Sequence, residues 1–354
     1  YKPSGTGESP LANLKDWVNI TDEKTGRKVK RETNTMPQLA GSSWYFLRFI
    51  DPLNSETFCD KEKEKYWMPV DLYIGGTEHA VGHLLYARFW QKFLFDLGYA
   101  YYEEPFRKLF NQGMVLGEDG QKMSKSKGNV INPDDVIAQY GADSLRLFEM
   151  FMGPLEATKP WSTAGIEGMN RFLKRIWRLI IDEETGNLKP NITDEEPEIR
   201  LNKLLHFTIK KITHDISDLD MKFNTSIAQM MIFVNELYKA EKISRKILNQ
   251  FVLLLSPFAP HIAEELWRRL GNQYSVSYEQ WPRYGEELAK ADMVTVVFSV
   301  NGKLRGKKEL QPDLSDKELE QEALDDQNVI KHIMGKEVVK IIVVKNKMVN
   351  IVVR

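Results

Sequence analysis

The run Val70-Asp71-Leu72-Tyr73-Ile74-Gly75-Gly76-Thr77-Glu78-His79 decides the fold. Its start, Val70–Ile74, is short and apolar, which predicts a buried strand that ends at Gly75-Gly76. Thr77 is expected as the N-cap of a helix that runs to Gly98. A strand, a glycine turn and a helix form the unit of a parallel α/β fold, with ligands bound at the strand's carboxyl end. The helix carries an apolar stripe of the kind that faces a core: Leu84, Leu85, Phe89, Phe93, Leu94 and Leu97.

A second run, Lys122-Met123-Ser124-Lys125-Ser126, lies in a polar loop framed by Gly117, Gly120 and Gly128. Lysine is a compact charge on a flexible stem, so this loop brings two ammonium groups and two hydroxyls to a polyphosphate. Such cations stabilise the charge that develops on a leaving pyrophosphate. The alternative is a solvated basic loop, but five fixed residues in a glycine-framed loop rarely coincide. The framing glycines also predict that the loop moves.

Composition sets limits on the class of protein. The chain has 354 residues, 42% of them hydrophobic and 28% charged, which predicts a globular protein of two or three domains. No apolar run is long enough to predict a membrane span. One cysteine, Cys59, excludes an intramolecular disulfide and predicts a reducing, cytoplasmic location. The net charge is −1, so any nucleic-acid binding must use local basic patches.

The changing pattern along the chain predicts four regions. Residues 1–112 alternate strand-like and helical stretches, and residues 113–164 contain the lysine-rich loop. Residues 165–290 are helical almost throughout, which predicts a helical bundle. Residues 291–354 return to short strands around a helix, which predicts a small α+β domain.

Two groups of basic residues are candidates for contact with nucleic-acid phosphates. The first follows one helix beside an apolar stripe: Arg171, Lys174, Arg175 and Arg178. The second follows a predicted strand in the last region: Lys303, Arg305, Lys307 and Lys308. A solvated helix face and a charged edge strand are the respective alternatives.

The sequence resembles the class I aminoacyl-tRNA synthetases, because the run Lys122–Ser126 matches their KMSKS signature. Further matches resemble the leucyl-tRNA synthetases in particular, and they extend nearly from end to end. The isoleucyl and valyl relatives carry an Asp-Gln pair where Glu78-His79 stands. The leucyl-like segments are 36–48, 73–90, 111–116, 128–133, Gly141-Ala142-Asp143, Arg171-Phe172-Leu173, Ser256-Pro257-Phe258-Ala259-Pro260-His261 and Val300-Asn301-Gly302-Lys303.

This resemblance implies the second half of a Rossmann-type catalytic domain, followed by a helical anticodon-binding-type domain and a small α+β tRNA-binding domain. The implied reaction is ATP-dependent activation of leucine to leucyl-adenylate and its transfer to tRNA(Leu). The expected cofactors are ATP with its Mg²⁺, and the chain itself is expected to bind no metal. Lys122 and Lys125 are the expected catalytic residues. The expected ATP and adenylate contacts are Gly76, Glu78, Met114, Val115, Lys122, Met123, Ser124, Lys125 and Ser126.

His79 and His83 are the expected leucine-binding residues. They are four positions apart, so they would share one helical face. A zinc site is disfavoured, because His79 lacks the following Glu of a metalloprotease motif and no third ligand suggests itself. Glu78 can accept two hydrogen bonds from ribose hydroxyls.

The His-Ile-Gly-His-type signature and the threonine-rich editing site of the family are missing, and the chain starts at Tyr1. The resemblance therefore implies the C-terminal part of a bacterial-type leucyl-tRNA synthetase, which would need the N-terminal half of the same protein to activate leucine. One alternative is a non-catalytic tRNA-binding fragment or a subunit of a split synthetase. Another is a related synthetase for a different aliphatic amino acid.

Overall fold

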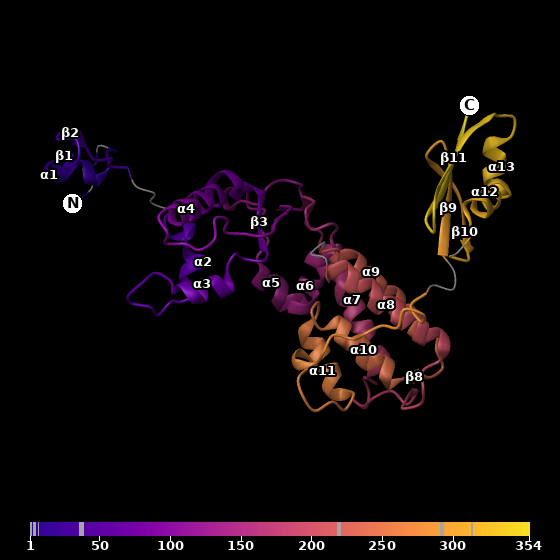
Figure 1. Cartoon of the computed structure of the whole chain (residues 1–354). Coiled ribbons are helices and arrows are strands. Elements are labelled where there is room, and N and C mark those ends of the chain that lie inside the picture. Colours follow the sequence, from indigo (N-terminus) through magenta and orange to yellow (C-terminus); the bar gives the residue numbers. More distant parts are fainter. Residues whose placement is uncertain are drawn as a thin grey trace. The chain divides into compact units, whose positions relative to one another are not determined.

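A computed structural model describes residues 2, 5, 7–34, 39–217, 221–290, 294–312 and 314–354 (Figure 1). The chain forms two compact units. The first contains Tyr1–Val115 and Glu156–Lys159, and the second contains Leu116–Leu155 and Pro160–Arg354. The fold class is mixed α/β, as the sequence predicts, while the division into four regions stays a prediction.

The helices and strands have the following bounds. The helices are α1 (Lys15–Val18), α2 (Tyr45–Arg48), α3 (Lys61–Trp67), α4 (Leu85–Asp96), α5 (Pro133–Tyr140), α6 (Ala142–Phe151), α7 (Thr163–Ile180), α8 (Ile199–Ser217), α9 (Phe223–Leu237), α10 (Arg245–Leu255), α11 (Pro260–Arg269), α12 (Asp316–Leu324) and α13 (Gln327–Ile333). The strands are β1 (Asn19–Thr21), β2 (Lys28–Lys30), β3 (Tyr73–Gly76), β4 (Leu109–Gln112), β5 (Val115–Leu116), β6 (Lys159–Pro160), β7 (Ile192–Thr193), β8 (Ile243–Ser244), β9 (Val294–Val300), β10 (Lys303–Leu310), β11 (Val338–Val344) and β12 (Met348–Val353).

The first unit is built on a parallel pair of strands, β3 and β4. Tyr73 lies opposite Leu109 and Gly76 lies opposite Gln112. The sequence predicted the strand at Val70–Ile74, but the paired segment lies later and includes both glycines. Val70 forms only an isolated bridge. The pairing of β3 with β4 therefore continues through Gly75 and Gly76.

The helix after β3 begins differently from the prediction. Thr77 is not an N-cap, because residues Thr77–His79 form a 3-10 turn and Ala80–Leu84 form one π-helical turn before α4. Such π turns are frequent at functional sites. The predicted end is confirmed, since Gly98 has φ 74° just beyond the last turn.

Most of the apolar stripe of this helix is exposed in the described part of the chain, although Leu84 and Leu94 are partly buried. Leu85, Phe89, Phe93 and Leu97 are 61%, 67%, 51% and 54% exposed, and Val81 one turn earlier is 85% exposed. The opposite side of the helix is buried at Ala87, which packs with the side chains of Phe46, Leu47 and Met68. The prediction of an amphipathic helix is thus correct, but the expected burial is wrong for Leu85, Phe89, Phe93 and Leu97.

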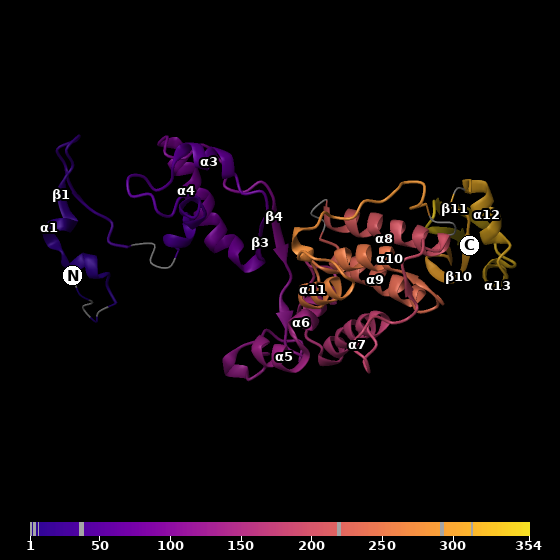
Figure 2. The same ribbon diagram turned by 90° about the horizontal axis from the view of Figure 1, so that it is seen from below.

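The second unit contains the helical bundle. Asn132 caps α5 through its side chain and Pro133 takes the first helical position. Gly141, at φ 84°, separates α5 from α6. Figure 2 shows α8, α9 and α10 side by side. Their inward faces are apolar and almost fully buried, with Ile209, Phe233 and Phe251 at the centre.

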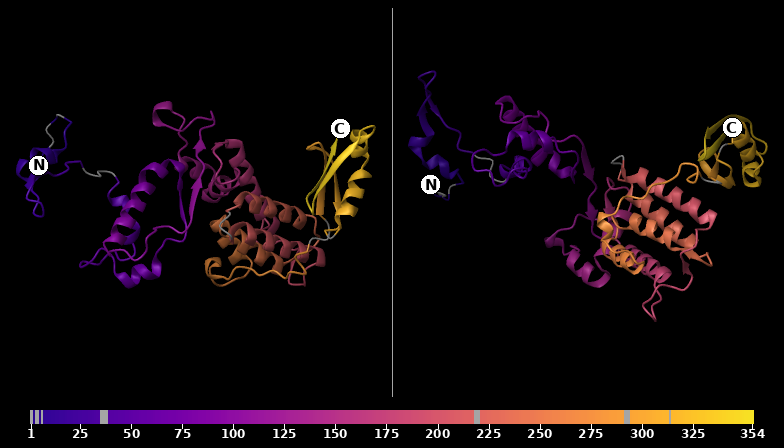
Figure 3. Two further views of the ribbon diagram at one scale, coloured as in Figure 1. Left: turned by 45° about the horizontal axis from the view of Figure 1, so that its top comes forward. Right: turned by 60° about the horizontal axis from the view of Figure 1, so that its bottom comes forward.

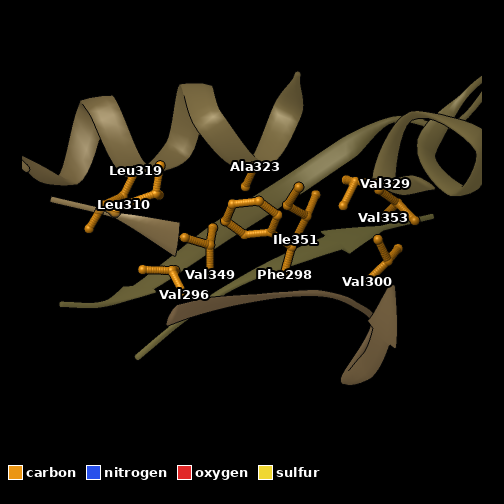
Figure 4. Close-up of a cluster of buried hydrophobic side chains, with 10 residues drawn as sticks. All are labelled: Val296, Phe298, Val300, Leu310, Leu319, Ala323, Val329, Val349, Ile351 and Val353. Carbon is orange, nitrogen blue, oxygen red and sulfur yellow. The ribbon is translucent and has the colours of Figure 1, made fainter. Parts of the chain in front are cut away.

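The last part of the second unit is the small α+β domain that the sequence predicts. Its four-stranded sheet has the order β10-β9-β12-β11, and β9 and β12 pair in parallel while the outer pairs are antiparallel. Helices α12 and α13 cover one face of the sheet (Figure 3). Phe298, Ile351 and Leu319 meet between these layers (Figure 4). The charged edge strand that the sequence analysis gave as the alternative for Lys303–Lys308 is present as β10, whereas α13 was missed as a helix. Among the described residues, no helix is long and apolar enough to cross a membrane.

Candidate functional site

A cavity of about 390 Å³ opens beside the glycine turn of the first unit. It contains both predicted leucine-binding residues, His79 and His83, although they lie in 3-10 and π turns rather than on one α-helical face. The wall is mainly apolar, with a few hydroxyl and imidazole groups, which is the usual character of a small-molecule site. The lining residues are Leu39, Ser42, Tyr45, Tyr73, Ile74, Gly75, His79, His83, Leu84 and Leu109.

Three polar side chains in this cavity form a hydrogen-bonded chain. The Tyr73 hydroxyl lies 2.6 Å from His83 Nε2 and 2.9 Å from the Tyr45 hydroxyl. Burial, followed by the hydrogen bond to Tyr45, raises the pKa of Tyr73, so this phenol stays protonated. Its single proton serves one of the two contacts, and the partner donates in the other.

His83 is held in its neutral form. Burial and the neighbouring His79 lower the pKa of His83 below its usual value of 6.5. Its Nδ1 atom is buried without a hydrogen-bond partner in the described part of the chain. A neutral imidazole suits an apolar pocket, because an unpaired neutral ring nitrogen there costs less than an unpaired charge.

Glu78 and Gly76 lie together at the carboxyl end of β3. A Cβ atom added to Gly76 would come within 2.2 Å of Glu78 Oε2, so the carboxylate is folded back over the glycine. The Glu78 side chain is exposed to solvent. The arrangement leaves both carboxylate oxygens available to accept hydrogen bonds beside an open stretch of backbone.

Met114 and Val115, the predicted nucleotide contacts, lie in a segment whose backbone packs against residues 157–159. The Met114 carbonyl accepts a hydrogen bond of 3.0 Å from the Lys159 amide. Gly113 is packed against the backbone of Ala157, where an added Cβ would lie 2.1 Å from the carbonyl oxygen. This segment is therefore rigidly placed within the first unit.

The KMSKS loop of the second unit is an ordered structure. A tight turn closes between Gly117 and Gln121, and Lys125–Lys127 form a 3-10 turn that ends at Gly128 with φ 67°. At the start of the loop, the Glu118 carboxylate accepts hydrogen bonds from the Thr163 amide (2.9 Å) and hydroxyl (2.6 Å). These hydrogen bonds lower the pKa of Glu118, which keeps this anchor ionised.

The three lysines of the loop have different surroundings. The Lys127 ammonium donates to Gln121 Oε1 at 2.6 Å. In contrast, the Lys122 and Lys125 side chains are exposed and form no ion pair with any described residue. The Ser124 and Ser126 hydroxyls lie 3.1 Å apart on the same loop. Two free cations and two hydroxyls are thus presented to solvent, which is the arrangement that a polyphosphate requires.

The basic stripe on α7 is partly engaged with the protein itself. Arg171 is 3.9 Å from Glu167, and Arg178 is 3.2 Å from Glu183. Arg175 donates to Asn235 and lies over the Tyr238 ring, 5.1 Å from its centroid. Lys174 is exposed.

The second basic group lies on β10, which is an edge strand of its sheet. Lys308 pairs with Val296 on the helix-covered face and forms an ion pair with Glu322. Lys307 points to the opposite face, and Lys303 is exposed at the start of the strand. Arg305 occupies a β-bulge, and its Nε is buried without a partner among the described atoms.

The sequence analysis did not single out Tyr45, Tyr73 or Ser42 as site residues. Tyr73 belongs to a run that reads as an ordinary core strand, and Tyr45 is 28 residues away. A hydroxyl within an otherwise apolar strand is the signal that could have identified Tyr73. Among the described residues, no group of three or more His, Cys, Asp or Glu side chains is arranged to hold a metal ion.

Known proteins resemble this chain in both parts. Residues 51–159 match the family "tRNA synthetases class I (I, L, M and V)", and residues 200–321 match "Anticodon-binding domain of tRNA ligase". The LeuRS of Agrobacterium radiobacter K84, solved in a ternary complex with tRNA and LeuAMS, is 33% identical with a TM-score of 0.69. The match covers 98% of this chain and 46% of the LeuRS chain.

Methionyl-tRNA synthetase of Mycobacterium tuberculosis, bound by methionyl-adenylate, is a more distant structural match. Its identity is 16% and its TM-score 0.44, over 58% of this chain and 45% of that one. The chain spans less than half the length of the LeuRS chain. On these matches, the chain contains a domain of the class I tRNA synthetases of the isoleucine, leucine, methionine and valine group and an anticodon-binding domain of tRNA ligases.

Proposed function

We propose that this chain is part of a leucine-tRNA ligase, which activates leucine with ATP and transfers it to tRNA(Leu). The observation that carries the proposal is the cavity around Tyr45, Tyr73, His79 and His83. Apolar walls suit an aliphatic side chain. Because the pKa of His83 is lowered, its imidazole is neutral, and a neutral imidazole suits an aliphatic ligand better than a protonated one would. The polar groups of the cavity suit the amino acid's charged end.

The KMSKS loop supports the ATP-dependent half of the reaction. The attacking group is the leucine carboxylate, so no protein nucleophile is required, and catalysis comes from positioning and charge stabilisation. Lys122 and Lys125, whose ammonium groups have no ion-pair partner in the described chain, would stabilise the departing pyrophosphate. Mg²⁺ would arrive with ATP. Gly76 and Glu78 would contact the adenylate, and Met114, Val115, Met123, Ser124 and Ser126 would complete the nucleotide contacts.

The exposed apolar stripe of α4 supports a further protein segment as a partner of the first unit. Parallel sheets are normally covered on both faces, and two strands are too few to be stable alone. Here β3 and β4 stand as a pair, and Ile74 and Leu109 on them are 48% and 44% exposed. We propose that the remaining part of the catalytic domain, in the same protein or as a separate subunit, adds strands and covers this stripe.

The basic residues support tRNA as the second substrate. Lys174 on α7 and Lys303 and Lys307 on β10 are exposed, and such cations bind nucleic-acid phosphates. Arg171, Arg175, Arg178, Arg305 and Lys308 would contribute less, since each already has contacts within the protein or is partly buried. We place the reaction in the cytoplasm, in accord with a single buried cysteine whose thiol pKa is raised to about 11 by burial.

The test is amino-acid-dependent exchange of pyrophosphate into ATP by the complete protein. Leucine should support exchange, and isoleucine, valine and methionine should support far less. Exchange that depends on another aliphatic amino acid would assign a different substrate. Binding of tRNA(Leu) with no exchange for any amino acid would favour a non-catalytic tRNA-binding subunit.

A further inference from the structure

We propose that Asn129 is a positioning residue that holds the KMSKS loop ready for ATP, and that Gly117 and Asp119 hold Asn129. We call these three residues the latch. The inference rests on the proposed function, because it assigns the latch a task within adenylate formation.

Asn129 binds the KMSKS backbone on both sides of Met123. Its Oδ1 accepts a hydrogen bond of 2.9 Å from the Ser124 amide, and its Nδ2 lies 3.4 Å from the Lys122 carbonyl oxygen, to which it donates. The half-buried Asn129 side chain therefore holds the backbone of Lys122 and the backbone of Ser124, which directly precedes Lys125. A loop fixed in this way loses less conformational freedom when it engages a ligand.

Asp119 holds Asn129 from the other side of the loop. Asn129 Nδ2 lies 3.2 Å from Asp119 Oδ2 and 3.3 Å from Oδ1. Asp119 Oδ1 also accepts from the Gln121 amide at 3.0 Å. The carboxylate thus receives neutral donors, and it does not pair with the Lys122 or Lys125 ammonium. The latch therefore places the loop's own carboxylate where it does not neutralise the two cations.

Gly117 provides the space for this contact. A Cβ atom at this position would lie 2.7 Å from Asp119 Oδ1 and 3.1 Å from Asn129 Nδ2. The Gly117 backbone is outside the left-handed region, so alanine is acceptable there apart from this collision. Gly117→Ala is consequently a specific way to displace the latch without removing either of its polar groups.

The experiment measures pre-steady-state pyrophosphate exchange by the complete enzyme. Asn129→Ala and Gly117→Ala should each lower the rate constant for adenylate formation by about 10²-fold, because displaced catalytic groups lose effective molarity. The leucine KM, the transfer of leucine from preformed adenylate and the melting temperature should not change. Asn187→Ala is the matched control, since that side chain is exposed and makes no hydrogen bond among the described residues.

A pair of exchanges tests whether the two latch residues act on one another. Asn129→Asp places two carboxylates together and should lower the rate constant. In the double variant Asn129→Asp, Asp119→Asn, the side-chain amide at position 119 can donate to the carboxylate at position 129. That carboxylate can still accept from the Ser124 amide, so most of the rate should return. A merely structural role would not confine the loss to adenylate formation.

The proposal is overturned if both alanine variants keep the wild-type rate constant to within about twofold. It is also overturned if the leucine KM rises and the transfer step slows together with pyrophosphate exchange. The same holds if the double substitution restores none of the lost rate. These results are distinct from a failure of the proposed function. If the wild-type enzyme exchanges pyrophosphate with another amino acid, only the assignment of leucine as the substrate is contradicted. The latch variants are then assayed with that amino acid. A wild type that exchanges with none contradicts both.

Discussion

The Tyr73 hydroxyl lies 2.6 Å from His83 Nε2, so a strand residue and a residue of the following π turn meet inside one cavity. Tyr73 is also stacked on Phe106, with the ring centroids 4.1 Å apart, which fixes the direction of its hydroxyl. The hydrogen bond therefore holds the orientation of the His83 imidazole. The shape of the proposed leucine pocket depends on this one contact.

Tyr73→Phe should raise the leucine KM while leaving the ATP KM unchanged. The variant keeps the stacking on Phe106 but removes a buried hydrogen bond, which has a net value of about 1 kcal/mol, or about fivefold in affinity. Tyr45→Phe is the comparison, since that hydroxyl is at the other end of the chain of hydrogen bonds. Steady-state exchange at varied leucine and varied ATP measures both constants. An unchanged leucine KM in Tyr73→Phe would remove the hydroxyl from the pocket.

The leucine KM should rise as the solution becomes acidic. Burial lowers the pKa of His83 below its usual 6.5, so the folded protein binds this proton more weakly than the unfolded chain does. The contribution of neutral His83 to stability and to the pocket is therefore complete above 6.5 and is lost as pH falls through its lowered pKa. Leucine KM measured from about pH 7.5 to 5.5 should show this rise, and His83→Gln should flatten it. Parallel profiles for the two proteins would exclude His83 as the titrating group.

Lys125→Ala should lower the rate of adenylate formation far more than it weakens leucine binding. Pyrophosphate gains charge as it departs, so a cation beside it stabilises the transition state preferentially. The loss should be about 10²–10³-fold, the usual effect of removing one such donor. Lys127→Ala should have a much smaller effect, because its ammonium is bound to Gln121. Equal losses in the two variants would show that general loop charge, rather than Lys125, is responsible.

The two neighbouring lysines of β10 should contribute differently to tRNA binding. Lys307 extends from the uncovered face of the sheet, whereas Lys308 is on the helix-covered face in an ion pair with Glu322. Lys307→Ala should weaken tRNA(Leu) binding and reduce the slope of log affinity against log salt by about one. Lys308→Ala should change the slope less. Identical slopes for wild type and Lys307→Ala would place the tRNA elsewhere.

Local sequence patterns predicted much of this fold because they report local physics. Gly98 ends its helix with a positive φ, as expected, and an Asn–Pro pair, Asn132 and Pro133, starts α5. The amphipathic pattern of α4 was also correct, but it could not reveal whether the chain supplies a cover for the apolar stripe. Burial depends on partners distant in sequence, and none of the described residues covers Phe89 or Leu85.

The sequence predicted which residue types belong to the site, but not the contacts between them. The lysines of the KMSKS loop could be recognised from spacing, yet the latch between Asp119 and Asn129 joins residues 10 positions apart through a turn that spacing does not define. The chain of hydrogen bonds from Tyr45 to His83 likewise requires α2, β3 and the π turn after it to meet, and Tyr45 and Tyr73 are 28 residues apart. Pattern could not show that Lys127 is bound and that Lys125 is not.

Charging of tRNA(Leu) by the complete enzyme tests the central claim most directly. Purified enzyme, ATP and Mg²⁺ are incubated with labelled leucine and transcribed tRNA(Leu), beside parallel reactions with labelled isoleucine, valine and methionine. The account predicts that leucine is esterified to tRNA(Leu), that tRNA(Ile) and tRNA(Val) are not charged with leucine, and that Lys125→Ala lowers the yield by slowing adenylate formation. Charging with another amino acid, or no charging by an enzyme that still binds tRNA(Leu), would contradict it.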